Sequence, residues 1–151
     1  MTPKPDTRDI CLVYASAATR AFEPNELVRM LAKAGRHNFR LDITGMLLYT
    51  EGSFFQVLEG NEQAVHALYE KIMADTRHAQ AIKLIEERID TRAFSRWSMG
   101  LAKVTRTELM QIPLLNDFFG QGSALTSLNE GRAKTLLAAF REGKWRRRLH
   151  G

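Results

Sequence analysis

One stretch of the chain constrains its fold more than any other, the residues Ser-Phe-Phe-Gln-Val-Leu-Glu-Gly at 53–60. Apolar side chains fall on both alternating faces, and glycines bound the stretch, which predicts a strand buried on both faces. Gln56 lies in its middle and shares a face with Phe54 and Leu58. A buried amide without partners costs roughly 1–3 kcal/mol. Gln56 is therefore either a core residue bonded to neighbouring backbone or a group that faces the polar edge of a ligand.

Hydrophobic periodicity predicts the other elements, in the order β-α-β-β-α-β-β. The strands are expected at residues 9–16, 41–49, 53–60, 79–88 and 98–103. Gly45, inside the second strand, lets another group approach its backbone closely. The helices are expected to start at residues 23–26 and at Asn61, and to end near Gly35 and Asp75. The fold class is therefore α+β, a ferredoxin-like core with a five-stranded mixed sheet and two helices on one face.

After Thr105 the pattern becomes helical, around residues 107–118 and 129–142. Two short amphipathic helices must bury their apolar faces, either on the open side of the sheet or against another subunit, so a homo-oligomer is also expected. The chain then divides into a disordered N-terminus at 1–8, a core domain at 9–104, a helical cap at 105–143 and a basic tail at 144–151.

Composition excludes several classes of protein. A chain of 151 residues corresponds to one domain. It has no run of about eighteen apolar residues and no secretory apolar segment, which predicts a cytoplasmic protein without a membrane span. The single Cys11 cannot form an internal disulfide and argues against a zinc site, so a buried thiol is expected. The net charge of +5 is concentrated at the C-terminus, in a tail expected to be solvated.

Six segments occur in an order and at spacings that resemble the BLUF family, blue-light sensors that use FAD. The segments are Leu12-Val13-Tyr14-Ala15-Ser16, His37-Asn38, Ile43-Thr44-Gly45-Met46-Leu47, Gln56-Val57-Leu58-Glu59-Gly60, Asp75-Thr76-Arg77-His78 and Phe94-Ser95-Arg96-Trp97-Ser98-Met99-Gly100. The similarity runs from about Ile10 to Lys103. The chain has no G-x-G-x-x-G motif, so a flavin is not expected in a Rossmann-type site. The resemblance implies FAD, with FMN or riboflavin as alternatives.

The resemblance implies that the isoalloxazine ring lies between the two helices. Met30 and Ile72 would flank it, although both also fit an ordinary hydrophobic core. Asn38 would bond the pyrimidine edge of the ring, with His37 close by. From the sequence alone, Asn38 is equally well explained as a residue that caps the C-terminus of the helix.

The photoactive pair implied by the resemblance is Tyr14 and Gln56. Gln56 would reach flavin N5 or the adjacent carbonyl, and the Tyr14 hydroxyl would bond its amide. A phenol gives up an electron and a proton together only if the proton has an acceptor. A neutral amide accepts on oxygen and donates from nitrogen, so Gln56 would relay the proton and then settle in a new hydrogen-bond arrangement.

Four further residues match family positions. Arg77 and His78 would assist the polar edge of the ring or the phosphates, but also fit a solvated turn. Trp97 and Met99 would exchange places near the glutamine and couple the signal to the C-terminal helices, or else pack in the core. The resemblance therefore implies a photoreceptor, not an enzyme, that signals to a separate and unidentified protein partner.

Two other functions compete with a photoreceptor. A ferredoxin-like module without photochemistry would bind a small molecule, or would present Phe54 and Phe55 to RNA. RNA-binding sheets expose aromatic residues among basic ones, whereas this strand is apolar, so nucleic acid is not an expected partner. A small acid–base enzyme would use His37 and a carboxylate, but no nucleophile, carboxylate pair or metal cluster supports one.

Overall fold

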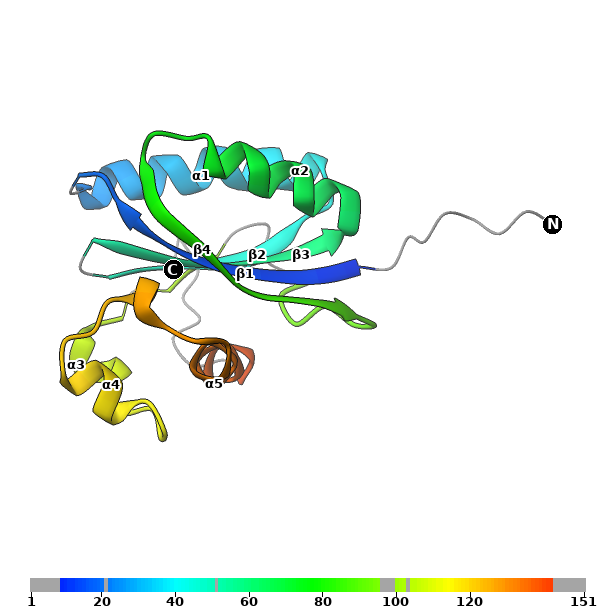
Figure 1. The fold of residues 1–151 in the computed structure, drawn as a ribbon. Helices are drawn as coiled ribbons and strands as arrows, with labels where there is room; N and C mark the ends of the chain where they lie inside the picture. Colours follow the sequence, from blue (N-terminus) through cyan, green and yellow to red (C-terminus); the bar gives the residue numbers. More distant parts are fainter. Residues whose placement is uncertain (1–8, 21, 51, 96–99, 103, 143–151) are drawn as a thin grey trace.

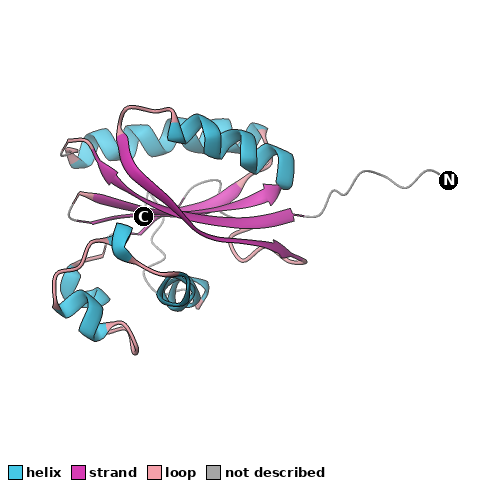
Figure 2. Ribbon diagram, viewed as in Figure 1, coloured by secondary structure: helices cyan, strands magenta, loops and turns pink. Residues whose placement is uncertain are grey.

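The sheet lies between two helical layers in the computed structural model, which describes residues 9–142 apart from 21, 51, 96–99 and 103. Two long helices cover one face and the C-terminal helices lie on the other (Figures 1 and 2). The elements are β1 (Asp9–Ala18), α1 (Pro24–Arg40), β2 (Thr44–Thr50), β3 (Ser53–Asn61), α2 (Glu62–Met73), β4 (His78–Ile89), β5 (Gly100–Ala102), α3 (Arg106–Leu109), α4 (Asn116–Gly120), the 3-10 turn η1 (Leu125–Ser127) and α5 (Glu130–Arg141).

The sheet has the strand order β4-β1-β3-β2-β5. The pairs β1–β3, β1–β4 and β2–β3 are antiparallel, whereas β5 runs parallel to β2. The first four strands and two helices form the predicted ferredoxin-like core, and β5 extends it at one edge. The predicted α+β fold is therefore confirmed. The predicted close approach at Gly45 is present too, because an added Cβ there would lie 1.9 Å from the Val57 carbonyl oxygen.

Alternation along β3 sends its side chains into two separate cores. Phe54 and Leu58 face α1 and α2, in a pocket-side core completed by Ile10, Leu12, Tyr14, Phe22, Leu27, Leu31, Ile43, Leu47, Val65 and Leu68. Phe55 and Val57 face the C-terminal helices, in a cap-side core that also contains Cys11, Val13, Phe94, Leu136, Leu137 and Phe140. The prediction that the C-terminal helices cover the open side of the sheet is confirmed.

The first helix continues five residues beyond Gly35, and the predicted end there is wrong. The helix starts as expected, with Pro24 in its first turn and the Glu23 N–H donating to the Glu26 carboxylate at 3.2 Å. A glycine inside a helix costs only about 1 kcal/mol, less than is recovered by packing a long amphipathic helix on a sheet. The left-handed residue that follows the helix is Asp42, with φ 55°.

The predicted single helix over 107–118 is also wrong, because Pro113 interrupts it. Proline has no N–H and disfavours helical geometry in the residue before it. The chain forms α3 and α4 instead, and Leu114 between them has a positive φ of 72°. The last predicted helix is confirmed as α5, where the Asn129 side chain accepts the Arg132 N–H at 2.8 Å.

The second strand starts at Thr44 rather than residue 41, since residues 41–43 complete the turn after α1. The fifth strand is described at Gly100–Ala102, and residues 98, 99 and 103 of the predicted strand lie outside the described residues. Among the residues that the structure describes, no helix has the length and apolar character needed to cross a membrane.

Candidate functional site

A pocket of about 510 Å³ lies on the α1 and α2 side of the sheet. Its size is in the range of small-molecule and cofactor sites. All eight sequence-predicted binding or photoactive residues in the described part of the chain line it: Tyr14, Met30, His37, Asn38, Gln56, Ile72, Arg77 and His78. The predicted coupling residues Trp97 and Met99 lie outside the described residues.

Tyr14 and Gln56 are directly opposite each other on the antiparallel strands β1 and β3. The Tyr14 side chain is fully buried, and its hydroxyl donates a hydrogen bond to Gln56 Oε1. Burial raises the pKa of Tyr14, and the charges of Tyr69 and Asp75 raise it further. The phenol therefore keeps its proton, which points at the amide oxygen of Gln56 in the hydrogen bond. The hydrogen bond expected between the two side chains is present.

Asn38 lies inside the last turn of α1 and is only 2% exposed. Its backbone carbonyl accepts the Ile43 N–H at 2.8 Å, which ties the end of α1 to the start of β2. It is not the left-handed residue after the helix, so its interpretation as a C-terminal cap is wrong. The Asn38 carboxamide lines the pocket instead, with His37 exposed at the rim.

Met30 on α1 and Ile72 on α2 are both half-buried, and both pack on the pocket-side core. Both also line the pocket. One apolar side chain from each helix therefore faces the space above Tyr14 and Gln56. Each of these side chains therefore fits both interpretations, as a residue that flanks the ring and as a residue of the hydrophobic core.

His78 and Arg77 differ, although the sequence treats them as one turn. The His78 ring lies 4.9 Å from that of Phe54, and its Nδ1 is 2.7 Å from the Oγ of buried Ser16. Burial lowers the pKa of His78, which favours the neutral ring. Arg77 is exposed and bonds Asp75, with Nε 2.9 Å from Oδ1, and this contact lowers the pKa of Asp75 to about 2. The solvated-turn interpretation therefore suits Arg77, but not His78.

Sequence reasoning missed three cationic side chains that line the pocket, Arg29 and Lys33 on α1 and Lys71 on α2. A signal for two of them was available, because Arg29, Lys33 and His37 follow one another at intervals of four and so share a helix face. Lys71 had no comparable signal. Ser16 belongs to the first of the family-matching segments, but the resemblance implies no role for it.

A separate polar group lies on α2 and β4, where side-chain N or O atoms of Glu62, His66 and Glu86 all lie within 4.8 Å of one another. His66 Nε2 and Lys83 Nζ each already contact Glu86 Oε1 at 3.0 Å. This group does not line the pocket, and nothing in its geometry distinguishes it from an exposed ion-pair network.

The pocket suits a flat ring system with apolar faces and a polar edge. Met30 and Ile72 offer apolar contact from two sides, and the amides of Asn38 and Gln56 offer both donors and acceptors. An isoalloxazine ring has this combination of apolar faces and a hydrogen-bonding edge. The fold and the pocket together define a ferredoxin-like domain suited to holding a flavin between its helices.

The chain belongs to the BLUF family, the sensors of blue-light using FAD, whose family model matches residues 10–100. By this description the matched region is a light-sensor domain. Among curated relatives, the photoactivated adenylate cyclase subunit beta of Euglena longa is 35% identical over 140 residues, covering 91% of this chain and 16% of the relative. The blue light- and temperature-regulated antirepressor BluF of Escherichia coli is 33% identical over 90 residues, covering 60% and 22%.

The chain thus spans less than a quarter of the length of these two curated relatives. Two solved structures match over nearly their whole length. "BlsA ground state" has 29% sequence identity and a TM-score of 0.78, covering 93% of this chain and 92% of the other. "BlrB - a BLUF protein, dark state structure" has 30% identity and a TM-score of 0.67, covering 88% and 98%.

Proposed function

We propose that this chain converts blue-light absorption by FAD into a rearranged hydrogen bond between Tyr14 and Gln56, which the C-terminal helices pass to a partner protein. One observation carries the proposal. The buried Tyr14 hydroxyl donates to the Gln56 amide within a pocket of suitable size. This is the arrangement that light-driven proton transfer requires, because donor and acceptor are already in contact.

When FAD is bound it supplies a photoexcited isoalloxazine ring, which is a strong oxidant. Tyr14 loses an electron readily only if its proton leaves at the same time, and Gln56 Oε1 is in place to accept that proton. The amide would then rotate or change tautomer, and both the electron and the proton would return to Tyr14, which leaves a neutral phenol and Gln56 in a different arrangement. No covalent bond to the cofactor is needed, and Cys11 lies in the cap-side core, away from the pocket.

The remaining pocket residues hold the ring. Met30 and Ile72 flank it, and Asn38 bonds its pyrimidine edge with His37 at the rim. His78 packs beside Phe54 and is fixed by Ser16, so we assign it to the polar edge of the ring. Support comes from the position of all these side chains around one pocket.

The cationic side chains at the pocket would favour FAD over riboflavin, because riboflavin has no phosphate group. Arg29, Lys33 and Lys71 line the pocket. Within the described part of the chain, neither Lys33 nor Lys71 forms an ion pair, whereas Arg77 is paired with Asp75. We therefore propose that Arg29, Lys33 and Lys71 bind the FAD phosphates and that Arg77 contributes less to this binding.

We assign the output of the sensor to the C-terminal end of the domain. Trp97 and Met99 are proposed to couple Gln56 to β5 and the helices after it. The names of the relatives, an adenylate cyclase subunit and an antirepressor, support a signalling protein as the downstream partner. A cytoplasmic location and self-association of the chain complete the proposal.

An RNA-binding module is a poorer explanation of the same fold. Phe54 and Phe55 are 1% and 0% exposed, so neither ring is available for stacking on a base. The decisive experiment is an absorption spectrum of the FAD-loaded protein before and after blue light. A small, reversible red shift is expected. A protein that stays colourless after supplementation with FAD contradicts the proposal.

A further inference from the structure

A buried carboxyl group in β3 has no part in the pocket. Glu59 lies three residues after Gln56 on the same strand and is 0% exposed. Its side chain is on the opposite face of the sheet from Gln56, in register with Cys11 of the cap-side core. Burying a carboxyl group is costly unless it is hydrogen-bonded, so the partners of Glu59 indicate what it does.

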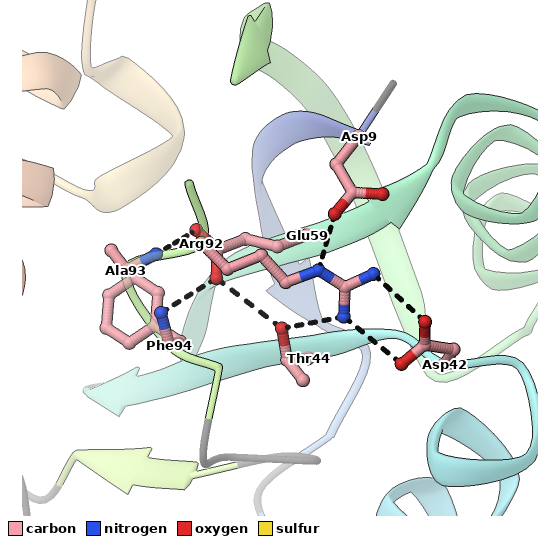
Figure 3. A network of polar contacts seen from close by, with 7 residues as sticks. All are labelled: Asp9, Asp42, Thr44, Glu59, Arg92, Ala93 and Phe94. Carbon is pink, nitrogen blue, oxygen red and sulfur yellow. Dashed lines mark hydrogen bonds and ion pairs between the residues drawn. The ribbon is translucent and has the colours of Figure 1, made fainter. Parts of the chain in front are cut away.

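Glu59 bonds the backbone of the connection between β4 and β5 (Figure 3). Its Oε2 accepts the Ala93 N–H at 2.9 Å, and its Oε1 accepts the Phe94 N–H at 2.8 Å. Each carboxyl oxygen therefore holds one of two successive amides. The Phe94 ring is 0% exposed and packs in the cap-side core. The connection is thus anchored to the central strand of the sheet by its backbone and to the cap-side core by a side chain.

Arg92 joins the same connection to two other strands (Figure 3). Its Nε donates to Asp9 Oδ2 at 2.7 Å, at the start of β1, and Nη1 lies 3.5 Å from the Thr44 hydroxyl, at the start of β2. Its contact with Asp42 is 3.4 Å long and that carboxylate is 91% exposed, so this pair contributes little. We refer to Glu59, Arg92, Asp9 and Thr44 as the polar clamp.

The strand order explains why a clamp is needed at this position. The strands β4 and β5 are at opposite edges of the sheet, so the connection between them must pass the ends of β1, β3 and β2. The clamp residues come from those three strands and from the connection itself. Within the described residues, three residue pairs join β5 to β2, so the placement of β5 also depends on where the connection is held.

We propose that the polar clamp transmits a change in β3 at Gln56 to β5 and the C-terminal helices, with Glu59 as its positioning residue. The inference rests on the proposed function. A displacement of β3 by a rearranged Gln56 amide moves the Glu59 oxygens relative to the two loop amides, about 10 Å further along the strand. The loop then follows β3 or loses one of the two bonds. Either response changes the packing against which α5 rests.

The test compares Glu59→Gln with the wild-type chain, both loaded with FAD. Glutamine keeps the size of the side chain and one acceptor oxygen, but its NH₂ group meets the second loop N–H, so one of the two bonds is lost. Two signals are recorded, the light-induced red shift and the light-minus-dark difference in hydrogen exchange over residues 104–142. We expect a red shift of wild-type size and an exchange difference below half of the wild-type value.

Val65→Ala is the matched control, a truncation at a fully buried residue of α2 that neither lines the pocket nor belongs to the clamp. It should keep the full exchange difference, which separates loss of the clamp from loss of stability. If Glu59→Gln does not fold, Arg92→Lys provides the same test, because lysine keeps the charge but lacks the guanidinium Nε that bonds Asp9.

The proposal is overturned if the clamp variant that folds retains the wild-type exchange difference, or if Val65→Ala loses as much. It is also overturned if the wild-type protein shows the red shift without an exchange difference over residues 104–142, a result that leaves the photoreceptor function intact. A wild-type protein without a red shift contradicts the proposed function itself, so the two failures are distinguishable.

Discussion

The Tyr14 hydroxyl carries a proton and contacts the amide oxygen of Gln56, which is in position to take that proton. We predict that Tyr14→Phe and Gln56→Leu each bind FAD but show no red shift, because ring packing survives while the proton path is removed. Tyr69→Phe is the control. The Tyr69 ring lies 5.6 Å from that of Tyr14, and this substitution leaves the Tyr14–Gln56 hydrogen bond unchanged. Absorption difference spectra measure the effect. A wild-type shift in Gln56→Leu would falsify the mechanism.

Asn38 is expected to act on binding rather than on photochemistry. Each neutral hydrogen bond lost in Asn38→Ala costs about 0.5–1.5 kcal/mol, or roughly two- to twelvefold in affinity per bond. Phe39→Ala is the control, because the neighbouring Phe39 side chain is 78% exposed. Titration of the apoprotein with FAD measures both. Unchanged affinity in Asn38→Ala would remove Asn38 from the ring site.

Variants of the two pocket lysines distinguish binding of the FAD phosphates from binding of the ring. The double variant Lys33→Ala, Lys71→Ala should bind FAD about two- to thirtyfold more weakly, at about 0.2–1 kcal/mol per exposed charge pair. Riboflavin binding should not change, and the difference should shrink at high salt. Lys134→Ala on α5 is the control. Equal losses for FAD and riboflavin would show that the lysines support the fold or the ring, not the phosphates.

At the scale of single elements, the sequence predicted where most elements are and was weaker on where they end. Period-two and helical patterns located β1, β3 and α2 within one or two residues. The end of α1 was missed because the packing of the whole helix on the sheet, which buries Asn38 beyond the glycine, outweighs the local cost of Gly35. The break at Pro113 was a local signal that was present and not used.

Gly45→Ala tests the close backbone contact between β2 and β3. Gly45→Ala would place a Cβ 1.9 Å from the Val57 carbonyl oxygen, so β2 and β3 must separate. We expect a loss of about 1–3 kcal/mol or more in the free energy of unfolding. Gly131→Ala is the control, because in α5 the nearest atom would be 3.6 Å away and helix propensity favours alanine. Urea unfolding distinguishes them, and equal midpoints would contradict the close approach.

At the scale of the whole molecule, periodicity alone could assign each side chain to a face of its strand, but not to a partner across the fold. The pairing of Tyr14 with Gln56 followed from the family resemblance. The Ser16–His78 contact joins residues 62 positions apart, and the contacts that the polar clamp makes through residues 92–94 join residues at least 34 positions apart, so no local pattern connects them. Such contacts depend on the order of the strands in the sheet. That order is established only when the elements pack together.

The C-terminal helices and the sheet share the cap-side core, and the last prediction tests how much this core stabilises the protein. Phe140 of α5 is fully buried, with its ring 5.9 Å from that of Phe55 in β3. Phe140→Ala should reduce the free energy of unfolding by about 3–5 kcal/mol through lost burial and a cavity. Met110→Ala, at a side chain that is 38% exposed, should change it by less than about 0.5 kcal/mol.

The folded fraction of Phe140→Ala should still bind FAD and give the red shift, because Phe55 and Gln56 point to opposite faces of β3. Denaturant unfolding followed by far-ultraviolet circular dichroism measures the stability, and absorption measures the shift. If Phe140→Ala unfolds at the wild-type midpoint, α5 does not contribute to the core of the sensor. The cap would then be an appendage that the light signal must reach by another route.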